Sequence, residues 1–190
     1  EQGANIHVYG SIQKEEGPKG TKIRLWYDLY TGAGRPGQGF RGLCYAESED
    51  GIHFKKPILG HVELNGSREN NLVMPNDLSK MTVGGGSVAR DTNPNCPPDK
   101  RYKSWSKLYT LPGSSRRGGN ASWYSADGFK WHLEETVPEG LRAADTQPSW
   151  FWDPGIGRYR GYSREVHPRM VGYNESDDML HWEKFQIVIR

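Results

Sequence analysis

The sequence is poor in cysteine and nearly balanced in charge, and both absences limit what the protein can be. Cys44 and Cys96 are the only cysteines among 190 residues, and their spacing establishes neither a disulfide nor a redox compartment. The 25 basic and 23 acidic residues leave a net charge of +2, without a basic block. Nucleic-acid binding is therefore not indicated, because it calls for a concentrated positive surface.

Long apolar segments and cofactor motifs are missing as well. No hydrophobic run approaches the ~18 residues of a membrane span, so we expect no membrane association. No set of His, Cys and Asp has metal-ligand spacing, and no glycine-rich loop opens a helix, so we expect no cofactor. The chain starts at Glu1 without a signal peptide, and we expect it to begin within a longer protein.

Glycine, proline and aromatic residues are plentiful instead. The chain has 24 Gly, 12 Pro and 7 Trp, and aromatic residues make up 12% of it. Many short strands joined by tight turns have this composition, and no long amphipathic helix is evident. The sequence therefore predicts an all-β fold.

One short motif occurs three times. It reads Ser-x-Asp-x-x-x-aromatic, and it covers 48–54, 125–131 and 176–182. In such a motif the Ser and Asp side chains accept hydrogen bonds from nearby backbone N–H groups, and the aromatic packs over the turn. Recurrence with a period of roughly 50 residues, between strand-like flanks, indicates a repeat architecture such as a β-propeller.

A second motif precedes each of these turns. Its pattern is basic-x-basic-x-aromatic, at 22–26, 101–105 and 158–162. Alternation with period two is typical of a strand. Three unrelated amphipathic strands could share the pattern by chance, but the constant order of the two motifs favours a repeat.

The two motifs divide the chain into about three propeller blades of four antiparallel strands each. We expect blades at 1–57, 81–135 and 145–190, with an insertion at 58–80. Closed propellers have about 4 to 8 blades. We therefore expect part of a propeller that another chain or segment completes, with a compact sandwich as the alternative. Blade centres are expected near 23–30, 102–109 and 159–164, and a short outer strand of the first blade at 53–56.

The blade endings resemble those of a known enzyme superfamily. The runs GLCYAESEDGIHFKKPILG, MVGYNESDDMLHWEKF and DTQPSWFWDPGIGRYRGYSR are similar to segments of the five-bladed β-propeller glycoside hydrolases of families 32, 43, 68, 117 and 130. The resemblance spans nearly the whole chain and implies a five-bladed propeller. Sialidase Asp-boxes fit less well, because they have one more residue between Ser and Trp.

The resemblance also implies catalytic carboxylates where the inner strands begin. By pattern, Asp145 matches the Asp that orients the substrate and tunes the general acid. Asp91 follows Arg90 as in the Arg-Asp-Pro of family 32, although Thr92 replaces the Pro. Glu175 is a third candidate. Each has a structural alternative: Asp145 as a backbone cap, Asp91 as a turn residue, and Glu175 as a repeated blade position.

Basic and aromatic residues are candidates for substrate binding. Arginines can hold a carboxylate or sulfate on a sugar, and Trp faces can stack on sugar rings. A solvated loop and core packing are the respective alternatives. The candidates are Arg90, Trp150, Trp152, Arg164, His167 and Arg169.

Taken together, the motifs predict a glycoside hydrolase that acts on an oligo- or polysaccharide through channel carboxylates. The alternatives are a non-catalytic carbohydrate-binding propeller and a glycoside phosphorylase, since one fold can carry either activity. We expect a carbohydrate as the binding partner and an extracellular or periplasmic location.

Overall fold

The computed structural model describes residues 4–18, 20–31, 40–75, 81–110, 119–134, 147–164 and 169–189. Within these ranges the regular secondary structure consists of strands, apart from one short 3-10 helix, η1. The strands are β1 (Ala4–Gly17), β2 (Gly20–Thr31), β3 (Arg41–Ser48), β4 (Leu72–Met74), β5 (Met81–Arg90), β6 (Tyr102–Thr110), β7 (Gly119–Ser125), β8 (His132–Leu133), β9 (Ser149–Asp153), β10 (Arg158–Arg164), β11 (Val171–Ser176) and β12 (Gln186–Ile189), and η1 is Pro98–Lys100.

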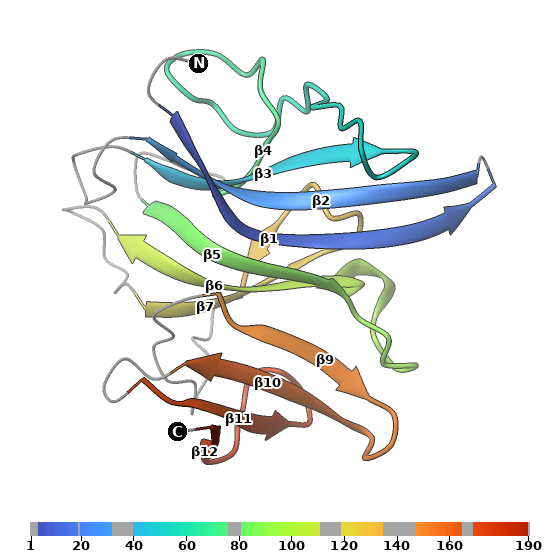
Figure 1. Ribbon diagram of the computed structural model, residues 1–190, viewed down its shortest axis with the longest axis vertical. Coiled ribbons are helices and arrows are strands. Elements are labelled where there is room, and N and C mark those ends of the chain that lie inside the picture. Colours follow the sequence, from blue (N-terminus) through green and yellow to red (C-terminus); the bar gives the residue numbers. More distant parts are fainter. Residues whose placement is uncertain are drawn as a thin grey trace.

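These strands form three four-stranded antiparallel sheets. The orders are β1-β2-β3-β4, β5-β6-β7-β8 and β9-β10-β11-β12. Figure 1 shows the sheets one after another from top to bottom, with β5 between β1 and β9. Three successive blades were predicted, and a two-layer sandwich is excluded. The three sheets do not close a ring.

The predicted blade centres are confirmed, because they fall within β2, β6 and β10. The outer strand of the first sheet differs from the prediction. It is β4, within the stretch expected to be an insertion, whereas Lys55 makes only an isolated bridge to Glu47. Leu72–Met74 is fully buried and apolar, so it can fill the core where the polar residues around Lys55 cannot.

Two aromatic-rich layers hold the sheets together. Trp26, Tyr45 and Trp123 are among the buried residues between the first and second sheets. Trp105 and Trp182 lie between the second and third, with stacked rings whose centroids are 5.2 Å apart. These layers fix the order of the sheets, because buried aromatic area is a large stabilising contribution.

The three Ser-x-Asp motifs form the predicted turns. In the first, Ser48 Oγ accepts hydrogen bonds from the backbone N–H groups of Asp50 and Gly51, while Asp50 Oδ1 accepts from residues 52 and 53. The same pattern recurs around Ser125 and Ser176. The residue after the Asp has a left-handed conformation in all three copies.

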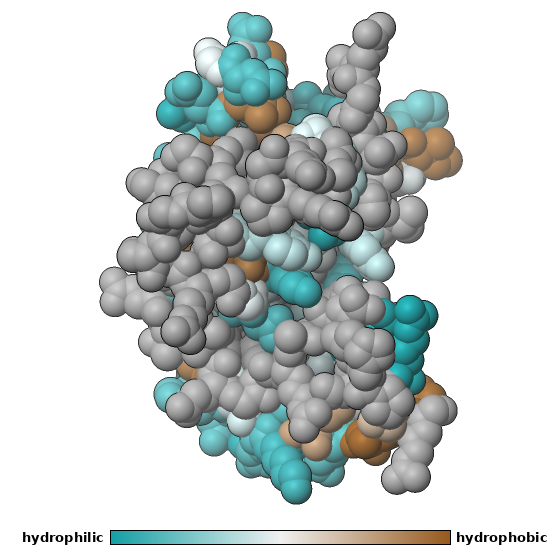
Figure 2. Space-filling model, turned by 90° about the vertical axis from the view of Figure 1, so that its left-hand side faces the viewer, coloured by the Kyte–Doolittle hydropathy of each residue, from teal (hydrophilic) through white to brown (hydrophobic). Residues whose placement is uncertain are grey.

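The inner strands β1 and β5 begin at the same end of the molecule, on the left in Figure 1. Figure 2 views the molecule from that side. The described surface in the middle of this view is mostly hydrophilic or neutral, and the larger hydrophobic areas lie toward the top and bottom. Among the described residues, no helix has the length and apolar character needed to cross a bilayer.

Candidate functional site

A polar cluster lies near the start of β5, between the first and second sheets. Asp28 of β2 is 1% exposed, and its Oδ2 accepts a hydrogen bond of 2.7 Å from the backbone N–H of Gly85. Arg41, the first residue of β3, forms an ion pair of 3.4 Å with the same oxygen. We call Asp28, Arg41 and their tyrosine neighbours the mouth cluster.

The run Gly84-Gly85-Gly86 makes this cluster possible. A Cβ on Gly84 would lie 2.6 Å from the guanidinium carbon of Arg41, so any other residue would displace that side chain. Gly85 has φ of 66°, which turns its N–H toward Asp28. The β5–β6 register shifts across the run, so the glycines form a bulge at the beginning of an inner strand.

Two tyrosines complete the mouth cluster. The ring centroids of Tyr30 and Tyr109 lie 5.3 and 5.7 Å from the guanidinium carbon of Arg41. Arg41 also donates a hydrogen bond of 3.2 Å to the Tyr109 hydroxyl. Burial raises the pKa of Tyr109, although the positive charge of Arg41 opposes the shift. Tyr109 is therefore neutral at physiological pH and can act as a hydrogen-bond donor or acceptor.

Gln147 connects the three inner strands. Its side-chain amide donates to the carbonyl oxygens of Gly10 and Gly86, at 3.3 and 3.2 Å, and to Ser11 Oγ at 3.4 Å. Gly10 and Ser11 belong to β1, Gly86 belongs to β5, and Gln147 lies two residues before the first residue of β9. Its amide therefore marks the point where the inner strands converge.

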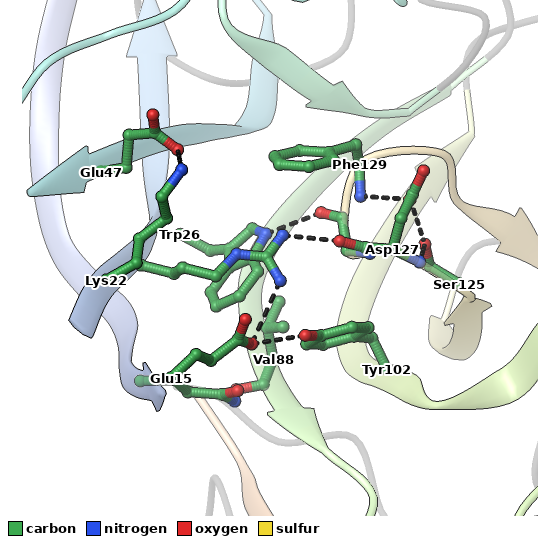
Figure 3. Close-up of polar contacts among 12 residues, drawn as sticks. Glu15, Lys22, Trp26, Glu47, Val88, Tyr102, Ser125, Asp127 and Phe129 are labelled. Carbon is green, nitrogen blue, oxygen red and sulfur yellow. Dashed lines mark hydrogen bonds and ion pairs between the residues drawn. The ribbon is translucent and has the colours of Figure 1, made fainter. Parts of the chain in front are cut away.

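The opposite end of the first interface has a different polar cluster, shown in Figure 3. Arg24 is 4% exposed and donates to the Asp127 carbonyl at 2.6 Å and to Glu15 at 3.1 Å. Tyr102 also donates to Glu15. The guanidinium carbon lies within 5.3 Å of four ring centroids. Since its donors and its charge are matched, this cluster joins two sheets rather than forming a site.

Asp91, a predicted catalytic residue, lies just past the end of β5, opposite the mouth cluster. Its Oδ2 forms an ion pair of 2.5 Å with Lys103 and accepts a hydrogen bond of 2.7 Å from the Tyr159 hydroxyl. Burial and this carboxylate raise the pKa of Tyr159. These contacts join the second sheet to the third. They favour a structural role, and the catalytic assignment of Asp91 stays a prediction.

Glu175, another predicted catalytic residue, lies in β11. It forms ion pairs with Arg158 and Arg160 of β10, at 3.4 and 3.3 Å. Tyr159, the partner of Asp91, lies between these arginines in sequence, and successive strand residues face opposite sides. Asp91 and Glu175 are therefore on opposite faces of the third sheet and do not form one catalytic pair.

The predicted binding residues do not lie together in the structure. Trp150 is buried and donates to the Ser87 carbonyl, and Trp152 packs edge-on against Tyr159, so both contribute to the core. Arg90 is exposed and lines a polar hollow with residues 91–94. Arg164 ends β10, and Arg169 is exposed. Asp145 and His167 lie outside the described residues, so their assignments stay predictions.

The mouth cluster was missed in the sequence. Asp28 stands between Tyr27 and Leu29 in an amphipathic strand. An acidic residue at such a position is normally expected to face solvent. Arg41 follows a glycine-rich stretch and has no motif around it. The signal that could have revealed the site was the triple glycine, because a run without side chains leaves space for another group.

No family model and no curated protein matches this sequence. Solved structures do. A β-fructofuranosidase from Schwanniomyces occidentalis complexed with fructose matches 97% of this chain with a TM-score of 0.62 and 13% identity, and 36% of that chain is covered. A member of the GH130 family of mannoside phosphorylases, described with glycoside hydrolases that target β-1,2 mannosidic linkages in Candida mannan, matches 97% with a TM-score of 0.58 and 16% identity, over 52% of its length.

An N-acetylgalactosamine deacetylase from F. plautii, in complex with blood group B trisaccharide, also matches 93% of the chain with a TM-score of 0.57, 13% identity and 52% coverage of that structure. The chain thus spans about a third to a half of the structures it matches. The likeness confirms the predicted fold, that of the β-propeller glycoside hydrolases. At this identity it does not determine the reaction.

Proposed function

We propose that this chain is part of a β-propeller enzyme that hydrolyses a glycosidic bond in an oligo- or polysaccharide. The observation that carries the proposal is the convergence of β1, β5 and the start of β9 on the amide of Gln147. Asp145 stands two residues before Gln147 in the sequence. Asp145 is the acid nearest to Gln147 in the sequence, and the proposal takes it as the residue that orients the substrate.

The mouth cluster supports the same proposal. Asp28 and Arg41 hold each other in place, while the Tyr109 hydroxyl adds a neutral polar group at the same end. Preorganised donors and aromatic rings are what sugar hydroxyls and ring faces require. In this proposal Arg41 and Tyr109 position the substrate, and Asp145 orients it and raises the pKa of the general acid by like-charge repulsion.

The test begins with reducing-sugar release from a panel of oligo- and polysaccharides. Asp145→Asn is expected to lower turnover by roughly 10²–10⁴-fold, the usual contribution of a positioned acid or base, without moving the urea midpoint. Asp99→Asn is the matched control, since this exposed acid in η1 is remote from the inner-strand starts. Full activity of Asp145→Asn, or loss of activity only in proportion to unfolding, would contradict the proposal.

A non-catalytic carbohydrate-binding propeller is the second candidate. Hydrolysis needs two carboxylates that flank the bond. In the described part of the chain, the mouth cluster offers only Asp28, which is already paired with Arg41 and Gly85. Glycan binding by calorimetry, without product formation, would support this candidate. Product formation that depends on inorganic phosphate would instead indicate a phosphorylase. We further propose action outside the cytoplasm, where polymeric glycans are found.

A further inference from the structure

Equivalent basic and aromatic residues lie at each junction between successive sheets. The residues Arg24, Lys103 and Arg160 are equivalent, because each follows the strand residue that pairs with a turn serine. Two residues further on stand Trp26, Trp105 and Tyr162. In the first two sheets these basic and aromatic side chains face the following sheet. The two aromatic residues are buried there: Trp26 is 0% and Trp105 is 1% exposed.

The contact at the first interface is made with the next Ser-x-Asp turn. Arg24 donates to the Asp127 carbonyl at 2.6 Å, and Trp26 Nε1 donates to the Gly128 carbonyl at 2.8 Å. A Cβ on Gly128 would lie 2.8 Å from both side chains, so an arginine-aromatic pair requires glycine in the turn. At the second interface the pair is Lys103 and Trp105, and the corresponding turn residue is Met179. There Lys103 donates to Asp91 and to the Tyr159 hydroxyl instead of to the turn, and Trp105 packs among Met179 and Trp182.

Equivalent serines of the inner strands also contact the next sheet. Ser11, Ser87 and Ser149 pair with Trp26, Trp105 and Tyr162, so the three serines are equivalent. Ser11 Oγ accepts a hydrogen bond from the backbone N–H of Val88 in the next sheet, and the Ser87 carbonyl accepts one from Trp150. Ser149 is exposed.

The third sheet has the same residues but no following sheet in the described part of the chain. Tyr162 lies between Phe151 and Tyr173, at centroid distances of 6.3 and 5.9 Å. Phe151 is 45% exposed, and the Arg160 side chain is 30% exposed, with ion pairs to Asp153 and Glu175 of its own sheet. We call Ser149, Phe151, Arg160, Tyr162 and Tyr173 the open face.

We propose that the open face is the docking surface for a further four-stranded sheet that presents a Ser-x-Asp-Gly turn. Arg160 donates to the carbonyl of the turn Asp, and Tyr162 packs on the turn glycine, as Arg24 and Trp26 do at the first interface. The ion pairs of Arg160 are partly exposed, so exchanging them costs little. Arg24, the equivalent arginine, contacts a turn with glycine at this position, so we expect a glycine turn opposite Arg160.

A second copy of this chain is a poorer occupant. Its own first turn, 48–54, is on the first sheet, but Val62 and Leu64 of the same chain pack against the outward face of that sheet. Val62 is 0% exposed and packs among Tyr27, Cys44 and Leu72. That sheet therefore cannot lie face to face on the open face without removing its own cover.

The test appends a second copy of residues 75–134 after residue 190. This addition supplies the natural connection between the first two sheets and a sheet with the Gly128 turn. We expect the fusion to unfold in one urea transition. Arg160→Ala should shift the urea midpoint of the fusion about as much as Arg24→Ala does, and the midpoint of the 190-residue chain much less. Arg68→Ala is the matched control, because Arg68 forms an exposed ion pair with Glu63 in the segment 57–71, remote from the third sheet, and should act equally in both proteins.

A second measurement covers the case in which a variant folds poorly. Hydroxyl-radical modification of Phe151 and Tyr162 should become several-fold slower in the unmutated fusion than in the 190-residue chain. Independent unfolding of the added sheet, or equal effects of Arg160→Ala in the two proteins, would overturn the proposal. So would a dimer of the 190-residue chain that Arg160→Ala dissociates, because the occupant would then be a second copy.

Discussion

The outward faces of the first and third sheets show two ways in which a blade can end. On the first sheet, the segment 57–71 does not continue the sheet as a strand. Its residue Val62 instead packs over Tyr27 and Cys44. On the third sheet, Phe151 and Tyr162 lie in a row that no described segment covers. The segment 57–71 thus takes the place of a neighbouring sheet on the first sheet. The third sheet instead presents residues that can pack against a neighbouring sheet.

The largest expected difference between the covered and open surfaces concerns equivalent aromatic residues. Trp26→Ala should lower the free energy of unfolding by about 3–5 kcal/mol, because it leaves a cavity between two sheets. Tyr162→Ala should lower it by about 1 kcal/mol or less, since its ring is only partly covered. Urea unfolding followed by far-UV circular dichroism measures both, and equal losses would show that the open face is buried in solution.

The covering segment of the first sheet provides the next test. Val62→Ala should lower the free energy of unfolding by about 2 kcal/mol, because Val62 is fully buried and its methyl groups leave a void. Ile58→Ala, in the same segment but at a position 70% exposed, should change it by less than about 0.5 kcal/mol. If the two substitutions have similar effects, segment 57–71 does not stabilise the sheet.

Thiol labelling also tests whether the segment 57–71 covers the first sheet. Cys44 lies beneath this segment, and burial raises the pKa of its thiol to about 12. Cys96 is only partly buried, and burial together with Asp91 raises its pKa to about 11. With a disulfide reagent at pH 8, Cys96 should react first. Val62→Ala should accelerate Cys44 alone, by about tenfold or more if labelling proceeds through local opening. Acceleration of both thiols would indicate global unfolding.

The smallest expected effect is the pH dependence of the stability that one Ser-x-Asp turn contributes. Burial opposes the charge of Asp178, but hydrogen bonds from His181 and Leu180 lower its pKa to about 2. A pKa below the unfolded value means that the stabilisation is present above about pH 4 and is lost as the pH falls toward 2. The side chain is 45% exposed, so we expect about 1 kcal/mol or less.

Urea midpoints of Asp178→Asn and the unmutated protein should therefore differ at pH 7 and converge near pH 2. Asp50→Asn in the first sheet should show the same sign, because the same backbone N–H groups bind its carboxylate. If the urea midpoints of the variant and the unmutated protein differ as much at pH 2 as at pH 7, the turn is not stabilised by the charge of the carboxylate.

Local patterns in the sequence predicted the fold well. The Ser-x-Asp turns and the strands before them depend on residues close in sequence, so their chemistry can be read directly. The outer strand β4 was misplaced because Lys55 and Leu72 both follow a turn signal, and only three-dimensional packing decides which of them fills the core. Asp28 and Arg41 meet across strands, above a glycine bulge, and no spacing rule connects them.

The turn residue after each repeated Asp has a consequence for how the chain assembles. Gly128 leaves room for Arg24 and Trp26, whereas Met179 accepts a left-handed φ of 66° and fills the space beside Trp105 itself. Each sheet is thereby fitted to one predecessor, because exchanging the second and third sheets would bring Met179 against Arg24 and leave a void beside Trp105. The size of this turn residue therefore distinguishes sheets that have similar sequences. During folding, a sheet that docks in the wrong position meets a steric clash, which disfavours that arrangement.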